Sequence, residues 1–215
     1  TVEIYMKLFL NNNKINFIIL FLSFMYASSD FLNNMPSIEY EKWKILKEGN
    51  ISVSYADEFD IPWCHAIAVY PNSIDQIYSV LKNLPNYKNI FDRVTDSIVL
   101  DDYNNIVYIK LDMPYFFANR DYTVQYVEKK DGRNIIFQFY SVLHPDAPLY
   151  DDSVTLPRAS GQWVLIPLSE NRTKVYYTWN GELLGNFPSI SLHTAWVEQG
   201  SEVLTWLYNY INVKE

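Results

Sequence analysis

Cysteine and basic side chains are scarce in this chain of 215 residues. Cys64 is the only cysteine, so an internal disulfide is excluded. Lys and Arg number 17 against 25 Asp and Glu, which gives a net charge of −8 and leaves no basic stripe to neutralise phosphates. These deficits argue against a nucleic-acid partner and against steady adhesion to an anionic membrane.

Sequence motifs for catalysis and metal binding are also missing. The three histidines, His65, His144 and His193, are far apart, and no pair has the spacing of metal ligands. The chain contains neither a Gly-x-Ser-x-Gly elbow nor a glycine loop of the kind that binds phosphates. We therefore expect a protein that is not an enzyme and that uses no metal or cofactor.

The chain is rich in apolar and aromatic residues. Hydrophobic residues make up 49% of it and aromatic residues 17%, including 18 Tyr and 6 Trp. No low-complexity linker divides the sequence, so we expect one globular domain with a large core, over residues 38–212. Aromatic side chains supply bulky apolar walls with a polar tip on each Tyr and Trp, which suits a lined cavity.

The first part of the chain has the pattern of an export signal. Lys7 and Lys14 provide a short basic region, Ile15 to Met25 is almost wholly apolar, and small residues follow up to Ser29. We interpret residues 1–29 as a signal peptide or an N-terminal anchor, with Thr1–Tyr5 upstream of a start at Met6. The uncharged run is shorter than the roughly 20 residues that cross a bilayer. The expected location is therefore outside the cytoplasm, secreted or periplasmic, with tethering by an uncleaved leader as the alternative.

The remaining sequence alternates with period two in many short segments and predicts an antiparallel sheet. Strands are expected at 51–55, 66–70, 94–100, 106–113, 121–128, 134–143, 156–167 and 173–182. Because most connections have the length of a hairpin, neighbouring strands should run antiparallel. A helix should begin after Ser73, with Gln76 completing a capping box, and end before Pro85.

A long helix is predicted from about Ser189 to Ile211. Its polar stripe holds Ser191, Ala195, Glu198, Glu202, Thr205 and Asn209, and its apolar side holds Leu192, Trp196, Val203, Leu207 and Tyr210. We expect the apolar side to lie on the sheet. Gly200 falls on that side, where the absence of a side chain permits close approach at a cost of about 1 kcal/mol in helix stability relative to Ala.

Charged residues indicate which face of each strand turns inward. Lys110, Asp121, Gln138 and Lys174 should face solvent, so their neighbours in sequence should face the interior. The inward set is Val107, Ile109, Leu111, Tyr122, Val124, Tyr126, Phe137, Phe139, Trp163, Leu165, Tyr177 and Trp179, joined by Trp196, Val203 and Leu207 of the helix. The same residues would also fill an ordinary packed core, so periodicity leaves both a lined pocket and a solid interior open.

One stretch, Met113 to Tyr122, sets opposite charges at Asn119-Arg120-Asp121 beside aromatic, alternating strands, where burial makes charge costly. It resembles the Asn-Arg-Asp turn of START lipid-transfer domains. Gly161 to Pro167 and Gly185 to Pro188 resemble further motifs of that family and follow in the family's order. The resemblance covers about residues 40 to 212.

The resemblance implies an α+β helix-grip fold, in which a curved antiparallel sheet wraps around the long C-terminal helix and leaves an internal hydrophobic cavity. It implies that the inward set binds one lipid or other hydrophobic small molecule, with Arg120 as a candidate contact for a head group and Arg158 as a second. It also implies transfer or presentation of the ligand between membranes through transient membrane contact, and we expect a monomer. The loop Leu143–Asp152 would be a lid, or else an inert excursion.

The chain departs from the family in one respect. Cholesterol-binding members carry an internal Glu and Arg pair, but the residue six positions after Arg120 is Tyr126. A sterol ligand is therefore not implied. Two other classes of function stay open: a cyclase-like helix-grip enzyme acting on a hydrophobic substrate, and a non-catalytic interaction module with a vestigial cavity.

Overall fold

The structure of the protein, a computed structural model, describes residues 32, 34–114, 117–184 and 188–213. The leader expected over residues 1–29 lies outside these ranges and stays a prediction. Within the ranges that the structure covers, no helix is both long and apolar enough to span a bilayer.

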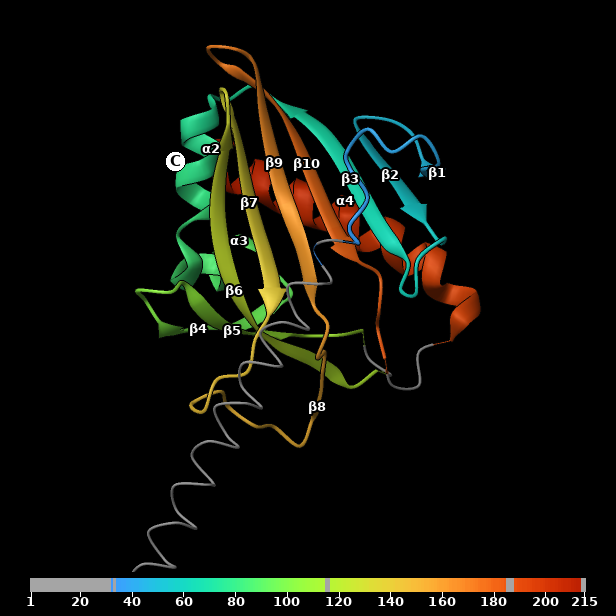
Figure 1. The fold of residues 1–215 in the computed structure, drawn as a ribbon, viewed down its shortest axis with the longest axis vertical. Helices are drawn as coiled ribbons and strands as arrows, with labels where there is room; N and C mark the ends of the chain where they lie inside the picture. The colour runs from blue at the N-terminus through green and yellow to red at the C-terminus, as the bar shows by residue number, and fades with distance from the viewer. Residues whose placement is uncertain (1–31, 33, 115–116, 185–187, 214–215) are drawn as a thin grey trace, which may run out of the picture.

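One curved sheet dominates the molecule (Figure 1). Nine strands run antiparallel in the order β1-β2-β3-β10-β9-β7-β6-β5-β4, and β8 pairs in parallel with the start of β6. The strands are β1 (Lys44–Lys47), β2 (Ile51–Ala56), β3 (Trp63–Tyr70), β4 (Val94–Asp101), β5 (Ile106–Leu111), β6 (Asn119–Asp131), β7 (Asn134–Ser141), β8 (Ser153–Thr155), β9 (Ser160–Ser169) and β10 (Arg172–Asn180). The predicted antiparallel sheet is confirmed, and it stays open between the edge strands β1 and β4.

The long terminal helix, α4 (Leu192–Asn212), crosses one face of this sheet after a short 3-10 turn, η2 (Ser189–Ser191) (Figure 1). Trp196, Leu204 and Leu207 are buried on its sheet side. Gly200 lies there as well, against β2, β3 and β10. The predicted helix-grip architecture is therefore confirmed.

The capping box at the first helix is also confirmed. The Gln76 backbone N–H donates to the Ser73 hydroxyl at 3.3 Å, and the Ser73 backbone N–H donates to the Gln76 side chain at 3.0 Å. Helix α2 (Ile74–Leu81) then buries Ile77 and Leu81 completely. No long helix follows Pro85. The chain forms two short helical segments, the 3-10 helix η1 (Leu84–Asn86) and the α-helix α3 (Tyr87–Ile90), before β4.

The alternation of charge along the strands assigns the two faces of the sheet correctly. Lys110 and Asp121 are paired across β5 and β6 and lie on the outer face. Asp121 and Gln138 were expected to face solvent but are buried, at 3% and 7% exposed. Lys110 was expected to face solvent as well but is only 8% exposed. Its ammonium group contacts the Asp152 carboxylate at 2.9 and 3.1 Å and lies 3.9 Å from the centre of the Tyr150 ring, because the loop before β8 folds over it.

Two local differences from the predicted strands have simple causes. The edge strand β1 was not predicted, because it is short and carries lysines at both ends, and Lys44 pairs with Asp57 at 2.6 Å. The strand predicted at 156–167 begins only at Ser160 and extends to Ser169. Pro157 precedes it and has no N–H to donate to a ladder, so the chain leaves the sheet after the separate strand β8.

Candidate functional site

A cavity of about 390 Å³ lies between α4 and the sheet. Its wall comes from strands β5, β6, β7, β9 and β10, from the α3–β4 region, and from α4. This volume falls within the range of small-molecule sites in proteins. Pro114, Thr194 and Glu198 on its wall are exposed, so the cavity reaches the surface beside the first turns of α4.

Stacked aromatic rings form the floor of the cavity. Tyr177 lies between Trp163 and Trp179, with centroids 4.5 Å and 4.8 Å away. Phe91 also stacks on Trp163, with ring centroids 6.3 Å apart. Trp163 and Tyr177 are direct partners across β9 and β10, so the strand register itself places these rings together. The result is a broad apolar surface with few rotatable bonds.

Four tyrosine hydroxyls interrupt this apolar wall. Tyr87 donates to the Leu81 carbonyl at 2.7 Å, and its hydroxyl also bonds with that of Tyr126. The Tyr177 hydroxyl interacts with the Gln199 side chain. Burial raises the pKa of each of these phenols, and that of Tyr122, above its ordinary value. They therefore stay neutral and keep their protons available for hydrogen bonds.

Arg120 lies at the end of the cavity near the β10–α4 connection and is 2% exposed. Its Nε donates to the Leu183 carbonyl at 2.6 Å, its Nη2 to the Leu184 carbonyl at 2.9 Å, and its Nη1 to the Ala118 carbonyl. No carboxylate within the described chain forms an ion pair with it, and burial lowers the pKa of its guanidinium. Asp121 cannot pair with it because consecutive strand residues point to opposite faces.

The structural role of Arg120 rests on its hydrogen bonds to main-chain carbonyls. It ties the start of β6 to residues 183 and 184, and Leu184 there has a backbone φ of 46°, a left-handed conformation that is uncommon for leucine. The guanidinium fastens the chain just before α4. A head-group role for it remains a prediction.

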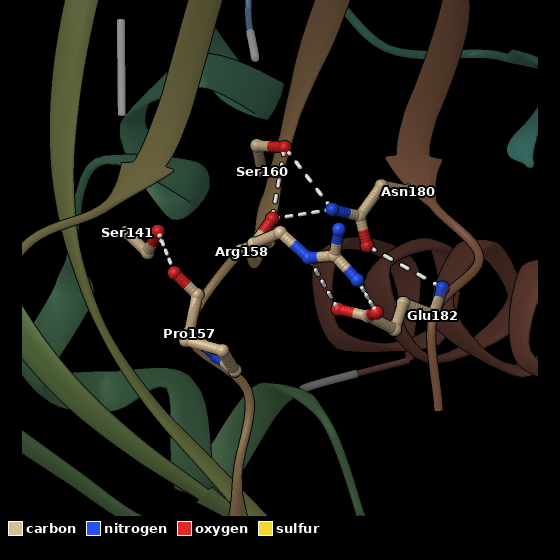
Figure 2. A network of polar contacts seen from close by, with 6 residues as sticks. All are labelled: Ser141, Pro157, Arg158, Ser160, Asn180 and Glu182. Carbon is tan, nitrogen blue, oxygen red and sulfur yellow. Dashed lines mark hydrogen bonds and ion pairs between the residues drawn. The ribbon is translucent and has the colours of Figure 1, made fainter. Parts of the chain in front are cut away.

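A polar network next to Arg120 explains the position of Arg158 (Figure 2). Its guanidinium forms a two-point ion pair with the Glu182 carboxylate, one contact being Nε to Oε2 at 3.1 Å. The Asn180 amide donates to the Arg158 carbonyl and, at 3.3 Å, to the Ser160 hydroxyl. Arg158 does not line the main cavity but borders a smaller hollow of about 270 Å³. Glu182 lines both spaces.

Another ion pair holds α4 at the edge of the cavity. Arg93, just before β4, binds Glu202 of α4 through two contacts of 2.7 and 2.9 Å. Ser191, Ala195, Glu198 and Glu202 of the predicted polar stripe line the cavity, although this stripe was expected to face away from the sheet. The difference arises because the cavity opens along the side of α4. There the Glu202 carboxylate pairs with Arg93, and the exposed Glu198 carboxylate is hydrated by solvent.

The structure brings ten of the sixteen predicted site residues together on the cavity wall. These are Ile109, Leu111, Arg120, Tyr122, Tyr126, Phe139, Trp163, Tyr177, Trp179 and Val203. The other six, Val107, Val124, Phe137, Leu165, Trp196 and Leu207, are buried beside the cavity but do not line it. Whether the ten bind a ligand stays a prediction.

Packing accounts for the six that do not line the cavity. Phe137 is covered by Tyr78 of α2, whose ring lies 5.7 Å away, and this helix closes one end of the sheet. Val107, Val124, Leu165 and Leu207 are fully buried in the core. Trp196 lines the smaller hollow, and its indole N–H donates to the Gly181 carbonyl at 3.1 Å.

Several cavity residues were not predicted. Tyr87 and Phe91 are four positions apart around α3, and their rings meet at 5.1 Å. The aromatic pair at helical spacing after Pro85 was the available signal. Trp206 of α4 and Met113 and Phe117 of the β5–β6 connection also line the cavity, and no periodic pattern marks the latter two.

The loop Leu143–Asp152, interpreted as a lid, contributes no residue to the cavity wall. It packs on the outside of β5 and β6 through Tyr150 and Asp152. The described residues around the mouth come instead from the β5–β6 connection, from Leu183, and from Ser191 and Thr194 at the start of α4.

No family model matches the sequence, and neither does any curated protein. Several solved structures do resemble the fold. A STAR-related lipid transfer protein fragment from Xanthomonas axonopodis is 21% identical with a TM-score of 0.70, over 80% of this chain and 99% of that one. Human StAR-related lipid transfer protein 5 is 15% identical with a TM-score of 0.71, over 89% and 98%. Human STARD10 is 17% identical with a TM-score of 0.70, over 85% and 77%. The chain therefore has the helix-grip fold of START domains.

Proposed function

We propose that this protein binds a single hydrophobic molecule, a lipid, in the cavity and transfers or presents it between membranes. The observation that carries the proposal is the cavity beneath α4, with its stacked aromatic floor and its opening at the surface. The similar solved structures from Xanthomonas axonopodis and human are named as lipid transfer proteins, which supports the same function.

The driving force for uptake is burial of apolar surface. Each Å² of apolar ligand surface kept from water contributes about 25 cal/mol, so a ligand that fits the cavity closely recovers there what it loses on leaving the bilayer. The rings of the aromatic wall stack on one another, which limits the side-chain entropy lost on binding.

Native mass spectrometry of the purified protein tests the proposal directly. A single adduct of defined mass, recovered as a lipid by solvent extraction, is the expected result. Incubation of ligand-free protein with lipid vesicles should restore the same one-to-one adduct. Failure to recover any hydrophobic adduct in either experiment would contradict the proposal.

The proposal extends to transient contact with a membrane, to action as a monomer, and to export from the cytoplasm. Export rests on the basic and apolar pattern of residues 1–29. The mass of the protein isolated from its source checks it, because a cleaved leader removes about the first 29 residues and a tethered form retains them.

A helix-grip enzyme is the second candidate, and the neutral tyrosine hydroxyls in the cavity are the observation in its favour, because a phenol can polarise a carbonyl. His65, His144 and His193 do not line the cavity. Product analysis after incubation with hydrophobic carbonyl compounds separates the two functions. An interaction module would need no ligand, and a stable fold with an empty interior in native mass spectrometry would favour it.

A further inference from the structure

Tyr122 differs in burial from its two neighbours on the inner face of β6, Arg120 and Val124. It follows Arg120 by two positions and faces Ile109 of β5, so its side chain points inward. Arg120 and Val124 on either side are 2% and 0% exposed, whereas Tyr122 is only half-buried. Since Tyr122 lines the cavity, the exposed part of its side chain faces the cavity.

The hydroxyl of Tyr122 has no hydrogen-bond partner among the residues that the structure describes. The other three phenols in the cavity are engaged: Tyr87 with Leu81, Tyr126 with Tyr87, and Tyr177 with Gln199. Trp179 also has an unpartnered indole N–H, but that atom is sealed inside the wall. Tyr122 is therefore the cavity tyrosine whose hydroxyl is free to donate to a ligand.

We propose that the Tyr122 hydroxyl selects the ligand by donating a hydrogen bond to an uncharged oxygen on it, a carbonyl or a hydroxyl. The inference rests on the proposed function and names the class of lipid: a hydrophobic body with a neutral oxygen acceptor within it. A plain hydrocarbon leaves this donor unpaired in an apolar cavity, and a buried unpaired donor is costly.

The charges on the wall explain why the acceptor should be uncharged. Arg93 is already paired with Glu202, and Arg120 already donates to three main-chain carbonyls and more weakly to the Asn119 carbonyl. Glu182 is paired with Arg158, whereas Glu198 adds negative charge to the same wall. An anionic group at the depth of Tyr122 would thus meet no free cation and would be repelled by the Glu198 carboxylate.

A competition experiment with the full protein tests the inference. Ligand-free protein is incubated with phosphatidylcholine vesicles that contain equal amounts of octadecane, methyl palmitate and palmitate. The protein is recovered, and the ligands are extracted and quantified by gas chromatography with mass spectrometry. The wild-type protein should hold methyl palmitate over octadecane by about fivefold, the effect of one hydrogen bond of about 1 kcal/mol, and should hold methyl palmitate over palmitate.

Tyr122→Phe removes only the hydroxyl and should abolish the preference for methyl palmitate while the uptake of octadecane is kept. Tyr140→Phe is the control, because Tyr140 lies on β7 and its hydroxyl bonds Gln125 outside the cavity at 2.8 Å. It should leave the ligand ratio at the wild-type value. Melting curves of both variants verify that they fold.

The possible outcomes separate the inference from the proposed function. If the preference persists in Tyr122→Phe, or if palmitate is held most tightly, the inference is wrong and the lipid-binding function stands. If the wild-type protein takes up none of the three probes and no vesicle lipid, the proposed function fails, and the inference fails with it.

Discussion

Gly200 of α4 lies against the Trp179 indole of β10 so closely that a Cβ at position 200 would be 2.9 Å from Cη2 of Trp179. The same Cβ would be 3.0 Å from the Ala66 side chain and 3.2 Å from that of Val53. The helix can therefore sit this close to the sheet only with glycine at this position. Trp179 forms part of the cavity wall, so this contact also sets one boundary of the cavity.

Gly200→Ala should lower the free energy of unfolding by about 1 kcal/mol. Overpacking a filled core costs about 1–3 kcal/mol, and the better helix propensity of alanine, about 1 kcal/mol, offsets only part of it. Urea denaturation measures the effect. Asn209→Ala on the exposed side of α4 should not destabilise, and a stabilised Gly200→Ala would contradict the tight contact.

Arg120→Met should destabilise the protein by about 2 kcal/mol, because it removes charged donors from carbonyls of residues 118, 183 and 184. Hydrogen exchange should become faster at the amides of residues 182–184. Arg133→Met, in the exposed turn between β6 and β7, is the control and should change neither measurement. Unaltered exchange at 182–184 in Arg120→Met would show that other contacts hold this segment.

Val203→Trp should reduce bound lipid at least about tenfold, equivalent to roughly 1.4 kcal/mol, because the larger side chain occupies part of the cavity. Val213→Trp makes the same change at the 70% exposed end of the helix and should leave lipid binding as in the wild type. Native mass spectrometry gives the bound fraction of each variant. Equal lipid loading of the two variants would place the ligand elsewhere.

The buried His65 should make stability depend on pH. Its ring lies 4.7 Å from that of Trp43, and its Nδ1 is 2.9 Å from the Thr178 hydroxyl, on the outer face of the sheet. Burial, with a smaller contribution from the positive charge of Lys174, lowers the pKa of His65 to about 4. The unfolded chain binds the proton near pH 6.5, so this contribution to stability is complete above pH 6.5 and is lost as the pH falls toward 4.

Between pH 7 and pH 5 the loss from His65 should be about 2 kcal/mol. His65→Gln removes the titration, so urea denaturation should show a flatter pH dependence in this variant than in the wild type. His193→Gln on the exposed side of α4 should keep the wild-type slope. The same slope in His65→Gln would mean that other groups cause the dependence.

Much of the fold could be predicted from the sequence, because charged residues mark the outer face of each strand. Lys110, Asp121 and Lys174 identified Ile109, Tyr122 and other inward residues without any structural information. The cavity itself could not be predicted from the two-residue period of the strands. Apolar and polar residues alternate in the same way whether a strand lines a cavity or packs in a solid core. The resemblance to START domains supplied that expectation.

The arrangement at the rim could not be predicted for a different reason. Arg93 and Glu202 are 109 positions apart, and no local pattern connects them. The rotation of α4 depends on this pair and on the space left at Gly200, so the polar stripe of the helix faces the cavity flank. The loop over Lys110 is a similar case, because an aromatic ring and a carboxylate from residues 150 and 152 bury a lysine that sequence assigns to solvent.

Trp163, Trp179 and Trp206, three of the six tryptophans, border the cavity. Binding of the proposed lipid would therefore change the surroundings of half of the indoles in the protein. Intrinsic fluorescence then reports filling and emptying in real time without any label, and Trp43, on the outer face against His65, supplies an internal reference signal.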